Sequence, residues 1–329
     1  MNRWLMILAM TLALLAPVSV QAADKPLKIA YSDWPGWVAW EVAIQKGWFK
    51  EAGVDVEFVW LEYGPSMEAF SAGKVDAVCV TNGDAMVTGA AGKKSTCIVI
   101  NDFSYGNDMV VARPGIKSMR DLKGKKIGVE LNFVDHLLLL KGLESVGLKE
   151  TDVTLVNMVT NDTPQALASG GVDAIAAWQP NSGQALKQVP GSKAIYTSED
   201  IPGLIYDGLY VSRESVAGRR PEWSKVVGVW FKVVSYIQDP KTRNEALKIM
   251  AARVQVTPEE YGNFLGGTYL LNLERNVKAY TVGETLESIY GSSVIVDKFN
   301  VARGVYKDAQ DVKSYLDPSF VMDLAKSAK

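Results

Sequence analysis

Short apolar-rich runs alternate with longer amphipathic segments along the 329 residues of this chain. Apolar-rich runs of about five residues predict buried strands. Such runs stand at 27–31, 55–60 and 126–129. The longer segments carry apolar residues three or four positions apart, which is the spacing of a helix that buries one face. Strands that alternate with helices predict an α/β fold built from βαβ units.

The pattern occurs twice, and both copies open and close on similar phrases. Lys28-Ile29-Ala30-Tyr31 opens the first copy, and Lys126-Ile127-Gly128-Val129 opens the second. The first closes on Gly73-Lys74-Val75-Asp76-Ala77-Val78 and the second on Gly170-Gly171-Val172-Asp173-Ala174-Ile175. Asp76 follows Ile29 by 47 positions, and Asp173 follows Ile127 by 46. Each copy therefore predicts a β-α-β-α-β lobe with a parallel-rich sheet flanked by helices, in which the two aspartates are structural.

Two similar lobes in one chain imply a ligand cleft between them, faced by the carboxyl ends of matching strands. The chain is expected to cross between the lobes near 111–113 and again near 206–210. The second lobe then spans 112–207, and the first combines 23–111 with 208–329. In the C-terminal part, helical periodicity predicts helices that pack largely against the first lobe, over 223–237, 242–253 and 258–264.

The first 22 residues have the pattern of a signal peptide that is cleaved on export. Arg3 supplies a basic start, 5–15 is an apolar core, and Val20-Gln21-Ala22 is a small-x-small cleavage site. The apolar core is short for a bilayer span. Because the first cysteine is Cys79, we expect no lipid anchor on the mature N-terminus. The sequence predicts a soluble protein, free in a bacterial periplasm.

Composition and motif searches narrow the classes of function. The chain is 48% hydrophobic and 22% charged with a net charge of −2, which argues against a nucleic-acid partner. No P-loop, dinucleotide fingerprint, Gly-x-Ser-x-Gly or metal-ligand spacing occurs, so we expect no cofactor, no metal and no catalytic residue. Cys79 and Cys97 fall on neighbouring predicted strands; export permits a disulfide between them, but we favour two buried thiols.

Four motifs resemble one family of binding proteins. They are the segment 43–56 (AIQKGWFKEAGVDV), Ala72-Gly73-Lys74-Val75-Asp76, the run 121–129 (DLKGKKIGV) and Trp178-Gln179-Pro180. Together they are similar to motifs of the periplasmic substrate-binding proteins of nitrate-, sulfonate- and taurine-type ABC importers, which are related to thiamine-pyrimidine binding proteins. Gln179 stands where that family has a glutamate in its Trp-Glu-Pro motif. The motifs together are specific for the family, but none of them identifies the ligand.

The resemblance implies a type II periplasmic binding protein, whose two lobes close on a small-molecule solute and deliver it to a membrane permease with its ATPase. Such a receptor is expected to be a monomer and not an enzyme. One alternative is a sensor or scaffold that docks on a membrane partner after ligand capture. Another is an enzyme similar to thiamine-pyrimidine synthases, which use histidine and lysine chemistry. The lone His136, at a predicted helix start, is more typical of a capping or surface residue than of a catalyst.

The stretch 31–40 (YSDWPGWVAW) organises the predicted site, because a strand end there meets a helix start. Trp37 and Trp40 stand three apart, a spacing that core packing on one helix face would also explain. Trp34 precedes the helix and is expected in the cleft. Over both lobes, the predicted ligand-binding residues are Asp33, Trp34, Trp37, Asn82, Asp84, Asp108, Glu130, Asp135, Trp178 and Asp207.

Carboxylates dominate this set, and helix capping is their structural explanation. Asp84 and Asp135 fit that explanation as well as they fit a binding role. Asp33 and Glu130 each stand just past the first strand of their copy, where the lobes should face one another. We therefore expect Asp33 and Glu130 to contact opposite sides of the solute.

Several carboxylates around one small cleft repel anions and are costly to desolvate, and a cationic ligand removes both difficulties. Tryptophan faces attract cations as well. The sequence thus predicts a small, planar, nitrogen-rich cation of guanidinium, amidine or amine type, stacked on Trp34 or Trp178. An aliphatic sulfonate, taurine or nitrate is the alternative that the resemblance supplies, although no inward basic residue is evident for it.

Overall fold

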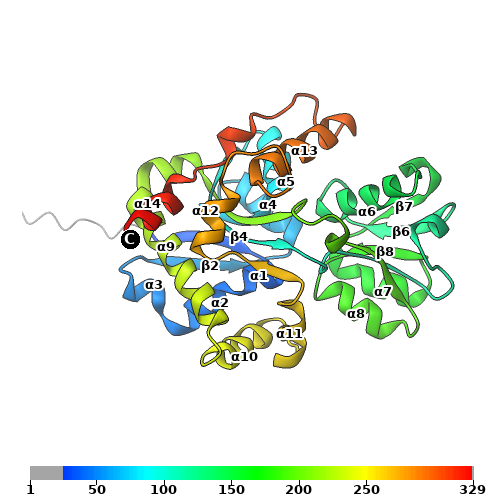
Figure 1. Cartoon of the computed structure of the whole chain (residues 1–329), viewed down its shortest axis with the longest axis horizontal. Helices are drawn as coiled ribbons and strands as arrows, with labels where there is room; N and C mark the ends of the chain where they lie inside the picture. Colours follow the sequence, from blue (N-terminus) through cyan, green and yellow to red (C-terminus); the bar gives the residue numbers. More distant parts are fainter. Residues whose placement is uncertain (1–24, 328–329) are drawn as a thin grey trace, which may run out of the picture.

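The structure is a computed structural model that describes residues 25–327, and it shows two α/β lobes (Figure 1). The sheet of the first lobe contains β1 (Leu27–Tyr31), β2 (Val56–Trp60), β3 (Ala77–Thr81), β4 (Ser95–Ser104), β10 (Tyr206–Ser212) and β11 (Thr268–Leu270). The sheet of the second contains β5 (Met109–Ala112), β6 (Lys126–Val129), β7 (Thr154–Asn157), β8 (Ala174–Ala177) and β9 (Lys193–Thr197). The strand orders are β11-β4-β10-β3-β1-β2 and β7-β6-β8-β5-β9. The predicted two-lobed fold is confirmed, while the expected signal peptide lies outside the described residues.

The internal repeat is visible in the strand pairing. β1 lies between β2 and β3 and is parallel to both, and β6 lies between β7 and β8 in the same way. The repeated aspartates close these units alike: Asp76 Oδ2 accepts the N–H of Lys28 at 2.8 Å, and Asp173 Oδ2 accepts the N–H of Lys126 at 2.8 Å. Each satisfies a backbone donor near the start of a central strand, so their predicted structural role is confirmed.

The remaining strands place the crossings between the lobes. β10 pairs antiparallel with β3 and β4, and β5 pairs antiparallel with β8 and β9. The chain therefore crosses at 105–108 and at 198–205, a few residues before the expected positions. This pairing puts 109–111 with the second lobe and 206–207 with the first, the reverse of the expected assignment. A hydrogen bond joins the two crossings: the N–H of Ser198 donates to the backbone oxygen of Asp108 at 3.0 Å.

Helices cover both faces of each sheet, and the C-terminal ones pack on the first lobe as predicted (Figure 1). Those of the first lobe are α1 (Pro35–Val38), α2 (Trp40–Lys46), α3 (Trp48–Glu51), α4 (Tyr63–Ser71), α5 (Asn82–Ala90), α9 (Arg213–Gln238), α10 (Arg243–Arg253), α11 (Pro258–Phe264), α12 (Leu273–Ala279), α13 (Ile289–Ala302) and α14 (Ser319–Ser327). Those of the second are α6 (Val134–Ser145), α7 (Thr163–Ser169) and α8 (Asn181–Gln188). Short 3-10 turns stand at Met119–Leu122, Glu150–Asp152, Thr160–Asp162, Ser198–Asp200 and Val312–Tyr315.

The core of the first lobe is rich in tryptophan. Trp40 and Trp230 are fully buried and lie 4.6 Å apart, so Trp40 is a core residue. Cys79 and Cys97 are buried free thiols, which confirms the favoured interpretation. Within residues 25–327, no helix is both long enough and apolar enough to cross a membrane.

Candidate functional site

Four aromatic side chains gather where the two lobes meet. Trp34 and Trp37 come from the turn and helix after β1, Tyr63 from the start of α4, and Trp178 from the end of β8. The Trp37 and Tyr63 rings stack at 5.4 Å with an interplanar angle of 19°, and Trp178 meets Tyr63 edge-on at 5.2 Å. Each of the four residues is at most 3% exposed. An aromatic wall of this kind offers π faces to a cation.

The rings border a narrow cavity of about 10 Å³ at the lobe interface, the aromatic cavity. Its described lining is Trp34, Trp37, Tyr63, Thr81, Asp108, Val134, Trp178 and Asp207. No lysine, arginine or histidine occurs among these described lining residues, whereas two of them are carboxyl groups. The described chain contains no group of three or more His, Cys, Asp or Glu arranged to hold a metal ion. The cavity is therefore both aromatic and acidic.

The two cavity carboxyls stand at the connections between the lobes. Asp108 lies at the end of the first crossing, just before β5, and Asp207 lies in β10, just after the second. Each is 2% exposed. Residues at a hinge stay near both lobes as these open and close. Asp108 and Asp207 thus reach the cavity from its hinge side.

Each cavity carboxyl has a second carboxyl beside it. Asp102 on β4 lies directly opposite Asp207 in the antiparallel pairing, so the two side chains are neighbours on one face of the sheet. Asp135 stands in the first turn of α6, and burial followed by the charge of Asp108 raises its pKa. Both Asp102 and Asp135 are fully buried. Two adjacent carboxyl groups can hydrogen-bond only when one of them carries a proton.

Few other donors reach these four carboxyls. Trp34 Nε1 donates to Asp102 Oδ1 at 3.0 Å. One oxygen each of Asp102, Asp108 and Asp207, and both oxygens of Asp135, have no hydrogen-bond partner among the described residues. Buried acceptors without donors are costly. The four carboxyls therefore require either protons or a ligand that carries N–H groups.

Burial is the main cause of the weak acidity of these groups. It raises the pKa of Asp108 to about 6 and the pKa of Asp102 to about 8. It also raises the pKa values of Asp135 and Asp207 well above the ordinary value, and their carboxyl neighbours add to the effect. Adjacent buried carboxyls cannot all be ionised without a counter-charge. Burial and the neighbouring carboxyls thus favour the protonated forms of these groups.

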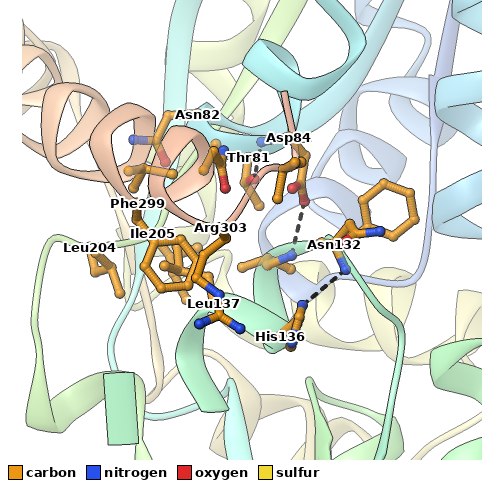
Figure 2. A pocket seen from close by; sticks show the side chains of 16 residues that line it. Thr81, Asn82, Asp84, Asn132, His136, Leu137, Leu204, Ile205, Phe299 and Arg303 are labelled. Atoms are coloured by element: carbon orange, nitrogen blue, oxygen red, sulfur yellow. Dashed lines mark hydrogen bonds between the residues drawn. The ribbon is translucent and has the colours of Figure 1, made fainter. Parts of the chain in front are cut away.

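Asp84 joins the lobes at one edge of the aromatic cavity. Its Oδ2 accepts the Tyr63 hydroxyl at 2.7 Å. From the second lobe it also accepts the N–H of Val134 at 3.2 Å, which Figure 2 shows as a dashed line. Thr81 caps α5 by accepting the N–H of Asp84 at 3.1 Å. Thr81, and not Asp84, is therefore the cap of α5, while Asp84 accepts the first N–H of α6 across the interface. Burial raises its pKa to about 7.

Asp33 is occupied by the second lobe and does not line the aromatic cavity. Its Oδ1 accepts Trp178 Nε1 at 3.0 Å, and its Oδ2 accepts Asn181 Nδ2 at 3.1 Å. Burial raises the pKa of Asp33, and the two hydrogen bonds oppose that shift. In this closed arrangement the carboxyl connects the lobes through protein donors.

Glu130 also faces the opposite lobe. Its Oε2 accepts the N–H and the hydroxyl of Thr160 at 3.2 and 3.0 Å, within the second lobe. On the first lobe it meets Gly64, where a Cβ atom would stand 3.0 Å from Glu130 Oε1. Burial raises the pKa of Glu130. The expected clamp of Asp33 and Glu130 on a solute is therefore replaced by contacts between the lobes.

Asn82 has a structural set of partners. Its Nδ2 donates to Ser292 Oγ at 3.0 Å and Ser293 Oγ at 3.1 Å, and its Oδ1 accepts the N–H of Tyr206 at 3.2 Å. These bonds join α5 to α13 and β10. Asn82 does not line the aromatic cavity, although it borders a second one.

The second cavity, of about 20 Å³, lies beside the first, where α13 approaches α6 (Figure 2). Arg303 pairs with Glu150 of the second lobe, and His136 Nε2 lies 3.7 Å from the same carboxylate. His136 Nδ1 accepts the N–H of Asn132 at 3.1 Å (Figure 2). Burial, and then the charge of Arg303, lower the pKa of His136 to about 4. His136 is therefore neutral and bound to backbone at a helix start.

Comparison with known proteins decides the family. The family model described as NMT1/THI5 like matches residues 35–227. A protein of Brucella abortus (strain 2308), named as a binding protein, is 30% identical over 282 residues, which are 82% of this chain and 86% of the relative. This chain belongs to the NMT1/THI5 like family.

Solved structures agree with the fold of the family. The periplasmic aliphatic sulphonate binding protein SsuA of Escherichia coli has a TM-score of 0.72 at 18% identity, over 91% of this chain and 100% of that one. The periplasmic nitrate-binding protein NrtA of Synechocystis PCC 6803 has a TM-score of 0.73 at 10% identity, over 92% and 89%. The predicted resemblance is thereby confirmed. The desulfurization enzyme DSZB also has this fold, with a TM-score of 0.66 at 15% identity over 92% and 99%.

In this NMT1/THI5 like protein, the cavity lining and the predicted site overlap in part. Of the predicted residues, those that line the aromatic cavity are Trp34, Trp37, Asp108, Trp178 and Asp207. Sequence reasoning missed Tyr63, Thr81 and Val134 in the lining, and Asp102 beside it. Tyr63 and Thr81 gave a positional signal, since Tyr63 stands shortly after β2 and Thr81 is the last residue of β3. Asp102 gave none, because it continues a strand and acquires its role only from its neighbour on β10.

Proposed function

We propose that this protein is the solute receptor of an ABC importer and works in the periplasm with a permease and its ATPase. We further propose that its solute is a small nitrogen-rich cation of guanidinium, amidine or amine type. One observation carries the proposal: the aromatic cavity presents the carboxyls of Asp108 and Asp207 between four aromatic rings, with no basic residue in its described lining.

The charge of the residues that line the aromatic cavity favours a cationic solute over an anionic one. A nitrate or sulfonate in the aromatic cavity would lie against Asp108 and Asp207 without a cation to balance it. A planar cation with N–H groups on its edges supplies the donors that these carboxyl oxygens lack. Contact with the tryptophan faces adds roughly 0.5–2 kcal/mol.

Contacts that form only when the lobes are closed couple solute binding to lobe closure. Trp178 Nε1 reaches Asp33 and the N–H of Val134 reaches Asp84 only when the second lobe lies against the first. A solute that touches Asp207 on the first lobe and Trp178 on the second favours this closed state, because it binds the open state with fewer contacts. Release to a permease then requires the lobes to part.

A receptor fits the site better than an enzyme does. His136 is held by the backbone of Asn132 and does not line the aromatic cavity. Burial raises the pKa of both Cys79 and Cys97, which makes their thiols poor nucleophiles. Since the fold is shared with an enzyme, the argument rests on these residues and not on the fold.

A thermal-shift panel tests the proposal on the purified mature protein. The cations are guanidinium, acetamidinium, methylammonium and tetramethylammonium; urea is the neutral member, and taurine, methanesulfonate and nitrate are the anions. We expect guanidinium or acetamidinium to raise the melting temperature, the anions to leave it unchanged, and Asp207→Asn to remove most of the shift. Asp323→Asn, at an exposed carboxyl, is the matched control. Stabilisation by taurine, methanesulfonate or nitrate beyond that by every cation would overturn the proposal.

A further inference from the structure

Asp102 lies beside the cavity carboxyl of Asp207, and Asp135 beside that of Asp108. These two neighbours support an inference that rests on the proposed function. We propose that Asp102 and Asp135 belong to the binding machinery as proton holders. In the empty site each shares a proton with the cavity carboxyl beside it, and an arriving cation displaces that proton to the solvent. Solute binding is thereby coupled to proton release.

The first pair is fixed by two adjacent strands. Asp102 and Asp207 lie opposite one another on β4 and β10, and Trp34 Nε1 holds Asp102 Oδ1 at 3.0 Å. Gly36 makes room for the other oxygen, since a Cβ atom there would stand 1.8 Å from Asp102 Oδ2. One oxygen of Asp102 is therefore bound to an indole, while the other, beside Gly36, has no hydrogen-bond partner among the described residues, and the fully buried side chain does not reach solvent.

The second pair spans the lobes. Asp108 lies in the first crossing, and Asp135 approaches it from the first turn of α6. Neither oxygen of Asp135 has a hydrogen-bond partner among the described residues. A fully buried, donorless carboxylate is strongly disfavoured, so we expect Asp135 to be protonated and to donate to Asp108. The start of α6 thereby stays bound to the hinge.

The surroundings supply no counter-charge to either pair. The titratable groups that act on the four carboxyls from the packed elements are Asp84 on α5, Glu130 after β6, Cys79 on β3 and Tyr261 on α11. All of these are neutral or acidic. A proton is therefore the cation that balances each pair when no solute is present.

The exchange balances in charge and in bonds. The O–H bond of the shared proton breaks, the proton passes to the buffer, and the freed carboxylate oxygen accepts an N–H of the entering cation. No electron transfer is involved. Because protons and the cation compete, affinity rises as pH rises across the range in which the pairs titrate. The slope is about tenfold per pH unit for each proton released.

Calorimetry with guanidinium chloride between pH 5.5 and 9 tests the coupling on the full mature protein. Guanidinium suits the test because a guanidinium group keeps its charge to about pH 12. Repeating each titration in buffers of different ionisation enthalpy counts the protons released. We expect release of at least one proton near pH 7 and an affinity that rises with pH until the pairs are ionised.

Two substitutions test which carboxyl pair releases the protons. In Asp102→Asn the amide can donate to Asp207 and accept from Trp34, as a protonated carboxyl does, and Asp135→Asn does the same for Asp108. Each is expected to reduce the released protons by about one and to flatten the pH dependence of affinity, while Asp323→Asn changes neither. Infrared difference spectra of the empty protein at pH 7 provide a ligand-free readout, in which each substitution should remove intensity from the protonated-carboxyl band.

The outcomes separate this inference from the proposed function. Guanidinium binding with a buffer-independent enthalpy and a pH-independent affinity would overturn the proton coupling alone. An empty protein without a protonated-carboxyl band would do the same, whichever solute binds. Failure of guanidinium and acetamidinium to bind at every pH would overturn the proposed function, and the inference with it.

Discussion

The indole Nε1 of Trp178 donates to Oδ1 of Asp33 over 3.0 Å, and this hydrogen bond joins the second lobe to the first. The same indole ring lines the aromatic cavity and lies edge-on to Tyr63 at 5.2 Å. One side chain therefore both borders the solute space and holds the closed state. A solute that orders Trp178 favours the bond to Asp33, which couples occupancy to closure.

Asp33→Ala removes the acceptor for both Trp178 and Asn181. Since each bond contributes about 0.5–1.5 kcal/mol, guanidinium binding should weaken by roughly five- to a hundredfold. The reason is a less stable closed state, so small-angle scattering should show a more open protein at the same solute concentration. Asp323→Ala is the control. Unchanged affinity in Asp33→Ala would mean that the interlobe bonds do not contribute to capture.

Tyr63→Phe keeps the aromatic ring against Trp37 but removes the hydroxyl that donates to Asp84 at 2.7 Å. Asp84 is left with less support in a buried position, at a cost of about 1–3 kcal/mol in the free energy of unfolding. Urea unfolding of the empty protein measures this loss. A stability equal to wild type would show that the hydroxyl is not needed to hold Asp84.

The raised pKa values predict how stability depends on pH. Asp84, Asp102 and Asp108 bind protons more tightly in the folded protein than in the unfolded chain. Their contribution is complete below the unfolded pKa of about 4 and is lost as pH rises through the folded values, up to about 8. His136 acts in the opposite sense, but only between its folded pKa of about 4 and its unfolded pKa of about 6.5.

Above pH 6.5 the carboxyls therefore dominate. The melting temperature of the empty protein should fall from pH 6.5 to pH 8.5, and saturating guanidinium should reduce that fall. Asp102→Asn should also reduce it, since the amide cannot ionise. A melting temperature that rises over this interval would contradict the assigned protonation of the carboxyl pairs.

Gly36→Ala places a Cβ atom 1.8 Å from Asp102 Oδ2 and 2.8 Å from Trp34 Nε1. The neighbours must shift, which should lower the free energy of unfolding by about 1–3 kcal/mol and disturb the bond between Trp34 and Asp102. Gly228→Ala is the matched control, because nothing lies within 4 Å of a Cβ atom there in the interior of α9. The control should be neutral or more stable by up to about 1 kcal/mol. Equal stability of the two variants would contradict the close approach of Gly36 to Asp102.

The two lobes were predictable from local patterns, because short segments of similar sequence recur in both copies of the repeat. Asp76 and Asp173 each bind a backbone N–H at a fixed distance along the chain, so the spacing survives in the sequence. The crossings were harder to place, since the apolar run of β5 gives no sign of which sheet it joins. Only its pairing with β8 and β9 assigns Met109 to the second lobe.

The candidate site was predictable in kind but not in detail. The acidic and aromatic character follows from residues at strand ends, such as Trp34 and Asp207. The orientation of each carboxyl depends on donors far away in the chain. Asp33 meets Trp178 from 145 positions away, and no local pattern encodes that bond. Asp102 continues a buried strand, so its pairing with Asp207 becomes visible only when β4 and β10 lie side by side.

The central claim is that the aromatic cavity selects a cation. Calorimetric titration of one wild-type preparation at pH 8 with guanidinium and with taurine tests it most directly, with Asp207→Asn measured in parallel. The account predicts saturable binding of guanidinium, no binding of taurine, and guanidinium affinity weakened about ten- to a hundredfold by the substitution, as expected for loss of a charged hydrogen-bond partner. Saturable taurine binding by the wild type, tighter than that of guanidinium, would contradict it.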